Sequence, residues 1–222
     1  MRRRLNLTAV PLVVFALVAV ARGASSPQGR CLSAKLKAIA RKEAGLLSCF
    51  AKVAAKGRAT TLGACVQKVH GRYVAAFTKA GSCGGDDITC ECLAENCAID
   101  VRLALPDAGP SRCESARLKA ALREAARMIG CNARGAAKGL IVDQACIRKA
   151  QTKYRGAFAR ATGCTGDQTT VETIVGEKCV AEVGADPIGG GTVSELCTSH
   201  ACDGVDARPR SGAWPGAAAR MP

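Results

Sequence analysis

The spacing of the cysteines constrains this chain most, because it occurs twice along the sequence. The first four cysteines are separated by 18, 16 and 18 residues, and the next four by 18, 15 and 18 residues. They are Cys31, Cys49, Cys65 and Cys83, followed by Cys113, Cys131, Cys146 and Cys164. Because an α-helix turns about 100° per residue, 18 residues make about five turns and return a side chain to its starting direction. Each set therefore predicts two helices with a cysteine near each end of one face.

Folding two such helices antiparallel places the outer cysteines opposite each other and the inner cysteines opposite each other. In the first set both pairs are centred on Gly57, and in the second both are centred between Lys138 and Gly139. Five helical turns hold two cysteines of one helix roughly 27 Å apart, which excludes a bond within that helix. We therefore expect the disulfides Cys31–Cys83, Cys49–Cys65, Cys113–Cys164 and Cys131–Cys146.

The residues between the cysteines also repeat, which indicates an internal duplication. The segment CLSAKLKAIARKEAGLLSC (31–49) aligns with CESARLKAALREAARMIGC (113–131), and CVQKVHGRYVAAFTKAGSC (65–83) aligns with CIRKAQTKYRGAFARATGC (146–164). The offset is 82 residues before the loop and 81 after it. Tyr73 and Phe77 align with Tyr154 and Phe158 among alanines. We expect these four aromatic rings to be buried.

The predicted fold class is all-α, with two duplicated antiparallel helical hairpins stapled by disulfides, each followed by an acidic helix. Repeat 1 spans 31–105, with its third helix in 84–105 after aspartate caps, and 106–112 is a linker. Repeat 2 spans 113–202, with its corresponding helix in 165–183 and a short final helix in 193–202. The Pro-, Ala- and Gly-rich tail 203–222 is expected to be disordered.

The N-terminus has the pattern of a secretory signal peptide. Three arginines at 2–4 precede the apolar run PLVVFALVAV at 11–20, and small residues follow at 21–24. The apolar run is shorter than the roughly 20 residues that span a bilayer, so we predict a signal peptide over 1–23 rather than an anchor. The mature chain is then expected in a periplasm or outside the cell, where disulfides form, without a membrane span.

Both hairpins share further motif residues. In each, a C-x17-C helix is followed by AAKG and then by C-x2-K, [KR]-Y-x2-A-F and a glycine close before the last cysteine. This pattern, over 31–83 and 113–164, resembles a cysteine-rich helical repeat of secreted, uncharacterised bacterial proteins. The resemblance covers about half of the chain. It implies an exported helical protein and carries no known activity.

Six cysteines lie outside the hairpins, three in each half. They are Cys90, Cys92, Cys97, Cys179, Cys197 and Cys202. Three cannot pair among themselves, so we expect either one bridge between the halves or two free thiols, and the sequence does not assign the pairs. An envelope protein that handles redox equivalents or metal is the alternative function that these cysteines raise, with His200 as a candidate ligand. Zero free thiols would favour a structural or binding role.

The net charge changes sign between each hairpin and the segment that follows it. Segments 31–83 and 113–164 carry net charges of +9 and +8, whereas 84–112 and 165–222 each carry −4. Either the hairpins bind an anionic partner, or the acidic helices neutralise their own hairpins and the remaining charge maintains solubility. The repeated basic positions are expected to form solvent-facing stripes and are the candidate polyanion-binding residues. They are Lys35, Lys37, Arg41, Arg117, Lys119 and Arg123.

Other function classes find little support. Aromatic residues are only 3% of the chain, which together with export disfavours nucleic acid as the partner. The chain has two histidines and lacks the serine-hydrolase, zinc-protease and phosphate-loop motifs, so we predict no enzyme, no cofactor and no metal site. The leading hypothesis is an exported structural or binding module whose basic helical surface meets anionic envelope or extracellular polymers.

Overall fold

The computed structural model describes residues 26–105, 110–184, 196–197 and 202, and this part of the chain is helical without strands. Its first repeat contains α1 (Pro27–Lys56), the 3-10 turn η1 (Ala59–Thr61), α2 (Leu62–Ala80) and α3 (Asp87–Leu103). Its second contains α4 (Arg112–Lys138), α5 (Gln144–Ala159), α6 (Gln168–Ile174) and the π-helical segment η2 (Val175–Ala181). The all-α class predicted from the cysteine spacing is therefore confirmed.

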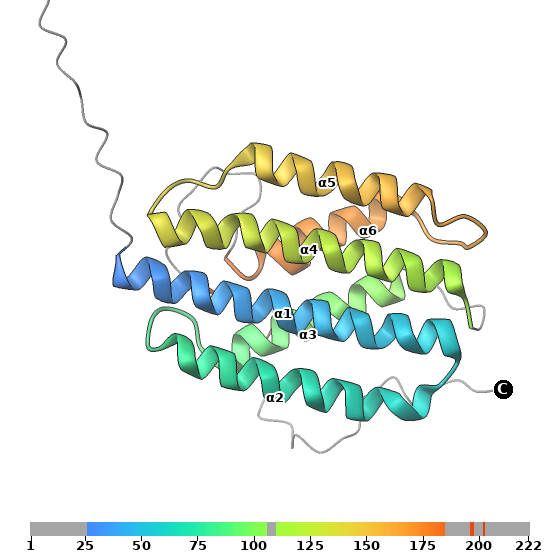
Figure 1. Cartoon of the computed structure of the whole chain (residues 1–222), viewed down its shortest axis with the longest axis horizontal. Coiled ribbons are helices and arrows are strands. Elements are labelled where there is room, and N and C mark those ends of the chain that lie inside the picture. Colours follow the sequence, from blue (N-terminus) through green and yellow to red (C-terminus); the bar gives the residue numbers. More distant parts are fainter. Residues whose placement is uncertain (1–25, 106–109, 185–195, 198–201, 203–222) are drawn as a thin grey trace, which may run out of the picture.

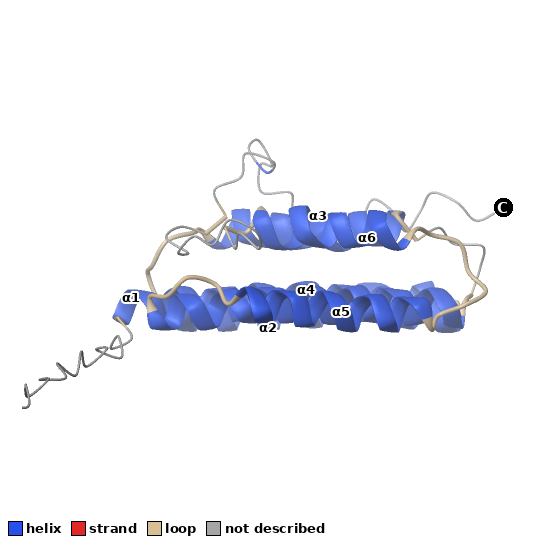
Figure 2. Ribbon diagram, turned by 90° about the horizontal axis from the view of Figure 1, so that it is seen from above, coloured by secondary structure: helices blue, strands red, loops and turns tan. Residues whose placement is uncertain are grey.

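The helices form two layers. Helices α2, α1, α4 and α5 lie side by side in that order (Figure 1), and α3 and α6 form a second layer over one face of them (Figure 2). The central helices α1 and α4 run antiparallel (Figure 1). The start of α4 therefore lies beside the end of α1, where the Ser111 amide donates to the Ala54 carbonyl at 2.7 Å. No described element covers the other face of the four-helix layer, which we call the open face.

Local sequence signals account for the ends of the long helices. The Ser26 and Ser111 hydroxyls accept hydrogen bonds from the Gly29 and Glu114 amides at the starts of α1 and α4. Gly57 and Gly139 end these helices with φ of 64° and 61°, a left-handed conformation that glycine adopts without a Cβ penalty. These glycines sit at the centres of the two cysteine sets, where the hairpins turn.

The four expected hairpin pairs are bonded in the structure. Their Cα–Cα separations are 6.1 Å for Cys31–Cys83, 5.9 Å for Cys49–Cys65, 5.7 Å for Cys113–Cys164 and 6.0 Å for Cys131–Cys146. Each hairpin is thus fastened at both of its ends, as the five-turn spacing requires.

The six remaining cysteines differ from both expected alternatives. They form three bonds between the halves, namely Cys90–Cys197, Cys92–Cys202 and Cys97–Cys179. All 14 cysteines are therefore paired, and neither a single bridge nor two free thiols is found. The prediction was wrong because it did not consider that all three leftover cysteines of one half can face those of the other.

The repeated aromatic residues are buried, as predicted. Tyr73 and Tyr154 lie between the two layers, and Phe77 and Phe158 pack against them one helical turn away. The Tyr73 hydroxyl donates to the Asp87 carbonyl at 2.9 Å and the Tyr154 hydroxyl to the Gln168 carbonyl at 3.1 Å. Asp87 and Gln168 begin α3 and α6, so each tyrosine fixes the second-layer helix of its own repeat.

The π-helical segment adjusts the register of the second repeat. The cap residues Asp86 and Asp167 are 81 residues apart, whereas the bonded pair Cys97 and Cys179 is 82 apart. A π-turn accommodates one extra residue within a helix, and η2 lies between Asp167 and the end of the repeat. The extra residue brings Cys179 onto the face that meets Cys97.

Several expectations concern segments outside the described residues. These are the signal peptide over 1–23, most of the linker 106–112, the short final helix in 193–202 apart from residues 196, 197 and 202, and the tail 203–222. Among the described helices, none combines the length and the apolar character needed to cross a bilayer.

Candidate anion-binding surface

Helices α1 and α4 each present one exposed stripe of side chains. Each is flanked by helices on both sides and packed on a second-layer helix, so its exposed residues point to the open face. The charged residues in these stripes are all basic. They are Arg30, Lys37, Arg41, Lys52 and Lys56 on α1, and Arg112, Lys119, Arg123, Arg127, Arg134 and Lys138 on α4.

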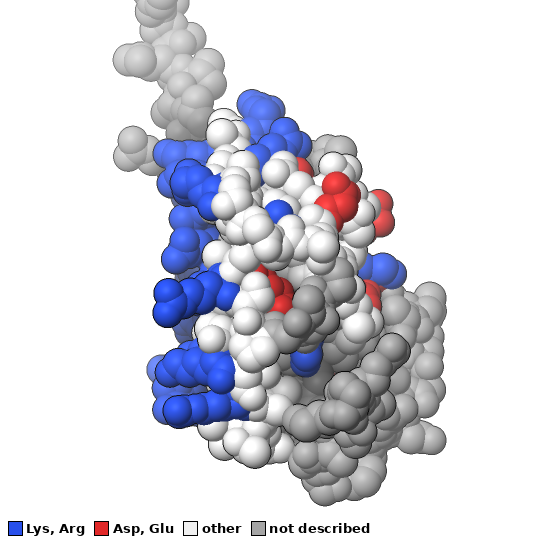
Figure 3. All heavy atoms as spheres, turned by 90° about the vertical axis from the view of Figure 1, so that its right-hand side faces the viewer, with Lys and Arg blue, Asp and Glu red and all other residues white. Residues whose placement is uncertain are grey.

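The outer helices extend this basic surface. Lys149 and Lys153 of α5 line one groove with Arg127 and Arg134 of α4, which places them on the open face. Their aligned residues in α2 are Lys68 and Arg72, both exposed. Figure 3 shows most of the visible lysines and arginines gathered along one side of the molecule, with the visible carboxylates away from it.

Carboxylates do not balance this surface within its own layer. The four helices α1, α2, α4 and α5 contain three acidic residues, Glu43, Glu114 and Glu124, and all three are buried. The exposed charges within these four helices are therefore positive only, and among the described residues that flank these helices the one exposed carboxylate beside them is Asp143, the N-cap of α5.

Four of the six candidate residues lie where the sequence predicted. Lys37, Arg41, Lys119 and Arg123 are exposed in the stripes of α1 and α4. Two residues are 200° apart on a helix when they are separated by two positions, so Lys35 and Arg117 cannot share the direction of Lys37 and Lys119. The prediction that all six form solvent-facing stripes is wrong for Lys35 and Arg117.

Lys35 and Arg117 instead close the ends of their hairpins. The Lys35 ammonium lies 4.5 Å from the centre of the Phe77 ring and donates to the Gly85 carbonyl at 2.8 Å. The Arg117 guanidinium lies 4.4 Å from the Phe158 ring centre and donates to the carbonyls of Thr165 and Gly166. Burial lowers the pKa of Lys35, although Asp86 and Asp87 oppose the effect. Both cations stabilise the fold and are removed from the candidate surface.

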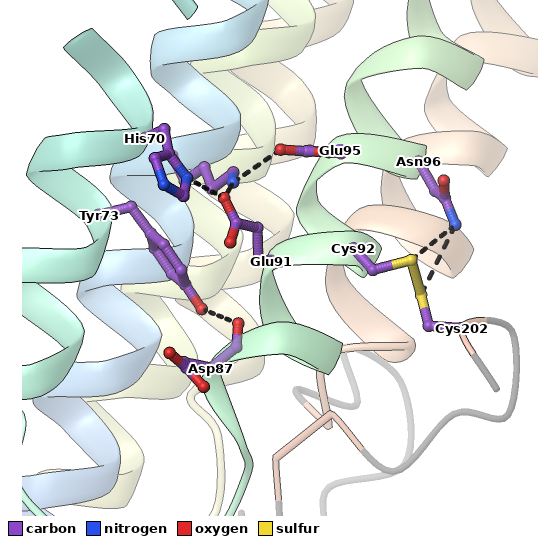
Figure 4. A network of polar contacts seen from close by, with 9 residues as sticks. His70, Tyr73, Asp87, Glu91, Cys92, Glu95, Asn96 and Cys202 are labelled. Carbon is purple, nitrogen blue, oxygen red and sulfur yellow. Dashed lines mark hydrogen bonds and ion pairs between the residues drawn. A yellow bond between two sulfur atoms is a disulfide. The ribbon is translucent and has the colours of Figure 1, made fainter. Parts of the chain in front are cut away.

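A buried lysine links the two layers of repeat 1. The Lys42 side chain is fully buried and forms ion pairs with Glu91 and, at 2.8 Å, with Glu95 of α3, while His70 of α2 contacts Glu91 as well (Figure 4). Burial alone would raise the pKa of Glu91, but the hydrogen bonds from Lys42 and His70 lower it. Part of the hairpin charge is therefore neutralised by the acidic third helix.

Repeat 2 has a glutamate at the position of this lysine. Glu124 aligns with Lys42, is 1% exposed, and has no hydrogen-bond partner for either carboxylate oxygen among the described residues. Burial, reinforced by the nearby Glu172, raises the pKa of Glu124 to about 9. Glu172 itself pairs with Arg155 at 2.7 Å. Glu124 is therefore protonated at neutral pH.

One further cluster lies at the centre of the second layer. The ligand atoms of Glu43, Cys97 and Cys179 lie within 4.8 Å of one another and are buried. The two sulfurs are bonded to each other, whereas metal ions bind thiolates. Burial raises the pKa of Glu43 well above its ordinary value. Two sequence signals pointed here: Glu43 interrupts the apolar period of α1, and the two cysteines are 82 residues apart, within one residue of the offset of 81 that relates the repeats after the loop.

Comparison with protein families, with curated proteins and with solved structures finds no match to this chain. The structure defines its class as a disulfide-stapled, two-layer helical protein built from two repeats.

Proposed function

We propose that this protein is an exported, non-enzymatic binding module that attaches to anionic envelope or extracellular polymers through its open face. One observation supports this proposal above the others. Every helix of the four-helix layer exposes lysine or arginine, and the three carboxylates within these helices are buried. A surface of one charge sign, extended over four long helices, binds a polymer of the opposite sign by many weak contacts.

The disulfides support the export and the rigidity that such a module needs. All 14 cysteines are paired, which is consistent with an oxidising compartment. Bridges at both ends of each hairpin hold neighbouring helices at a fixed separation, and three more join the repeats. The pairing also favours a binding module over the redox or metal-handling alternative, because that alternative requires reactive thiols.

Internal neutralisation explains only part of the basic charge. The pairs Lys42–Glu91 and Arg155–Glu172 connect the four-helix layer to α3 and α6. The stripe residues of α1 and α4 are exposed, whereas α3 and α6 cover the other face of the four-helix layer (Figure 2). The positive charge that remains on the open face is therefore available to bind an anionic partner.

Heparin chromatography of the mature chain tests the proposal. We expect retention at low salt and a steep loss of affinity as salt rises, because each neutralised charge releases counterions. Arg123→Glu, on the open face, should elute at clearly lower salt. Lys178→Glu makes the same charge change on the exposed surface of η2 and should elute near the unaltered protein. Retention that ignores salt, or equal effects of both variants, would overturn the proposal.

A further inference from the structure

A groove of about 310 Å³ runs between α4 and α5 on the open face. Small residues, including Gly130 and Ala150, and the Cys131–Cys146 disulfide form part of its lining. The charged residues of the lining are all basic. They are Arg127, Arg134, Lys149 and Lys153. The groove thus concentrates four positive charges around an apolar floor and has no carboxylate in its lining.

Arg134 is held over this floor by weak contacts. Its Nη2 atom lies 3.5 Å from Cys131 Sγ and also contacts Cys146 Sγ. Sulfur is a weak acceptor, whereas a guanidinium has five N–H donors that suit charged oxygens. An anionic oxygen in the groove would therefore be a better partner for Arg134 than the disulfide.

The corresponding place in repeat 1 is filled. Arg127 aligns with Gly45 and Ala150 aligns with Val69. A Cβ atom added at Gly45 would lie 2.7 Å from both methyl carbons of Val69, so the valine occupies the space between α1 and α2. Repeat 1 keeps three of the four basic residues at aligned positions, as Lys52, Lys68 and Arg72. The two repeats thus offer similar charge on the same face, but repeat 2 alone combines an arginine at the position of Arg127 with a small residue at that of Ala150.

We propose that the groove between α4 and α5 binds a phosphate group with two or more negative charges, such as pyrophosphate or a phosphomonoester end of a larger molecule. Four cations around one groove repel one another, and a multiply charged anion relieves that repulsion more than a single charge does. Paired Arg and Lys donors from two helices can bind several of its oxygens at once. This inference rests on the proposed function, because it assigns a chemical group to the same open face.

Calorimetric titration of the mature chain with inorganic pyrophosphate tests the groove, with sulfate at equal ionic strength for comparison. Arg134→Ala with Lys153→Ala removes one arginine and one lysine from the groove. Lys52→Ala with Arg72→Ala removes the aligned lysine and arginine from repeat 1. We expect the first double variant to weaken pyrophosphate binding about tenfold or more, and the second by less than about twofold.

The outcomes separate this inference from the proposed function. Equal weakening of pyrophosphate binding in both double variants, or no saturable pyrophosphate binding, would show that the groove is not a phosphate site. Salt-dependent heparin retention would then be a property of the whole open face. Saturable pyrophosphate binding without heparin retention supports the groove and overturns the polymer-binding function.

Vesicles distinguish the source of the phosphate. Vesicles containing phosphatidic acid present a phosphomonoester, and vesicles containing phosphatidylglycerol present a diester. A preference for phosphatidic acid that is lost in Arg134→Ala with Lys153→Ala supports a lipid headgroup as the ligand. Equal binding to both vesicles, together with saturable pyrophosphate binding, supports the groove with a soluble or polymer-borne phosphate.

Discussion

Cys97 of the first repeat and Cys179 of the second are bonded to each other, 82 residues apart. Cys97 lies in α3 and Cys179 in η2, the corresponding second-layer segments of the two repeats. Both cysteines are fully buried, and Glu43 of α1 approaches their sulfurs within the same cluster. The bond therefore joins the second-layer helices where the two repeats meet.

Removing this bond should loosen the contact between the repeats. We expect Cys97→Ala with Cys179→Ala to lower the free energy of unfolding by about 2–4 kcal/mol, measured by denaturant titration. Hydrogen exchange should increase in α3 and η2, which the bond connects, more than at the hairpin turns.

Removing Cys49 and Cys65 is the matched control, because that bond closes a short hairpin within repeat 1. Cys65 is half-buried, so its removal leaves less buried empty volume than removal of Cys97 and Cys179. A larger loss of stability from Cys49→Ala with Cys65→Ala would contradict a central role for the Cys97–Cys179 bond.

Lys35 and Lys37 should have opposite roles although they are two residues apart. Lys35→Met removes the donor shared by the carbonyls of Cys83, Gly84 and Gly85, so we expect unfolding to require about 1–3 kcal/mol less. Its elution from heparin should stay near that of the unaltered protein. Lys37→Met should change stability by less than about 0.5 kcal/mol and lower the salt concentration of elution. The reverse pattern would return Lys35 to the binding surface.

The buried Glu124 should make stability depend on pH. The unfolded chain loses this proton near the ordinary pKa of 4.5, whereas the folded protein keeps it until pH rises to about 9. The folded state binds the extra proton between these values, so the free energy of unfolding falls as pH rises through that window. The loss is bounded by about 1.4 kcal/mol per pH unit.

Glu124→Gln should remove this decrease in the free energy of unfolding at higher pH. Relative to the unaltered protein, we expect the variant to gain on the order of 2 kcal/mol between pH 5 and pH 8, since its amide has no proton to lose in that range. Glu177→Gln, an exposed change in η2, is the control and should show no such gain. Parallel stability curves for Glu124→Gln and the unaltered protein would show that Glu124 titrates normally in the folded state.

The hairpins could be predicted from the sequence because helical periodicity and cysteine pairing impose the same geometry. A five-turn spacing leaves one antiparallel arrangement, and the recurrence of Tyr73 and Phe77 among alanines identified buried positions. The direction of each basic residue was harder to predict. Lys35 and Lys37 are both repeated cations, and only the packing of the 83–85 loop and Phe77 against α1 separates them.

The cysteine pairing in the second layer could not be predicted from local sequence patterns. Pairing of Cys90 with Cys197 and of Cys92 with Cys202 brings together residues more than 100 positions apart. The groove between α4 and α5 likewise arises from a paired difference between the repeats, in which Ala150 in place of Val69 adds space and Arg127 in place of Gly45 adds a charge. An alignment of the repeats contains this difference, but its consequence depends on how closely the helices approach.

The same difference predicts that a second groove can be built in repeat 1. Val69→Ala removes the methyl groups that a side chain at position 45 would meet, and Gly45→Arg then supplies the residue that repeat 2 has at Arg127. Together with Lys52, Lys68 and Arg72 this creates the charge arrangement of the α4–α5 groove. We expect calorimetry to show two pyrophosphate sites per chain in place of one. Val69→Ala alone is the control and should keep one site, because it adds space without the fourth cation; a second site in that control would show that space alone is sufficient.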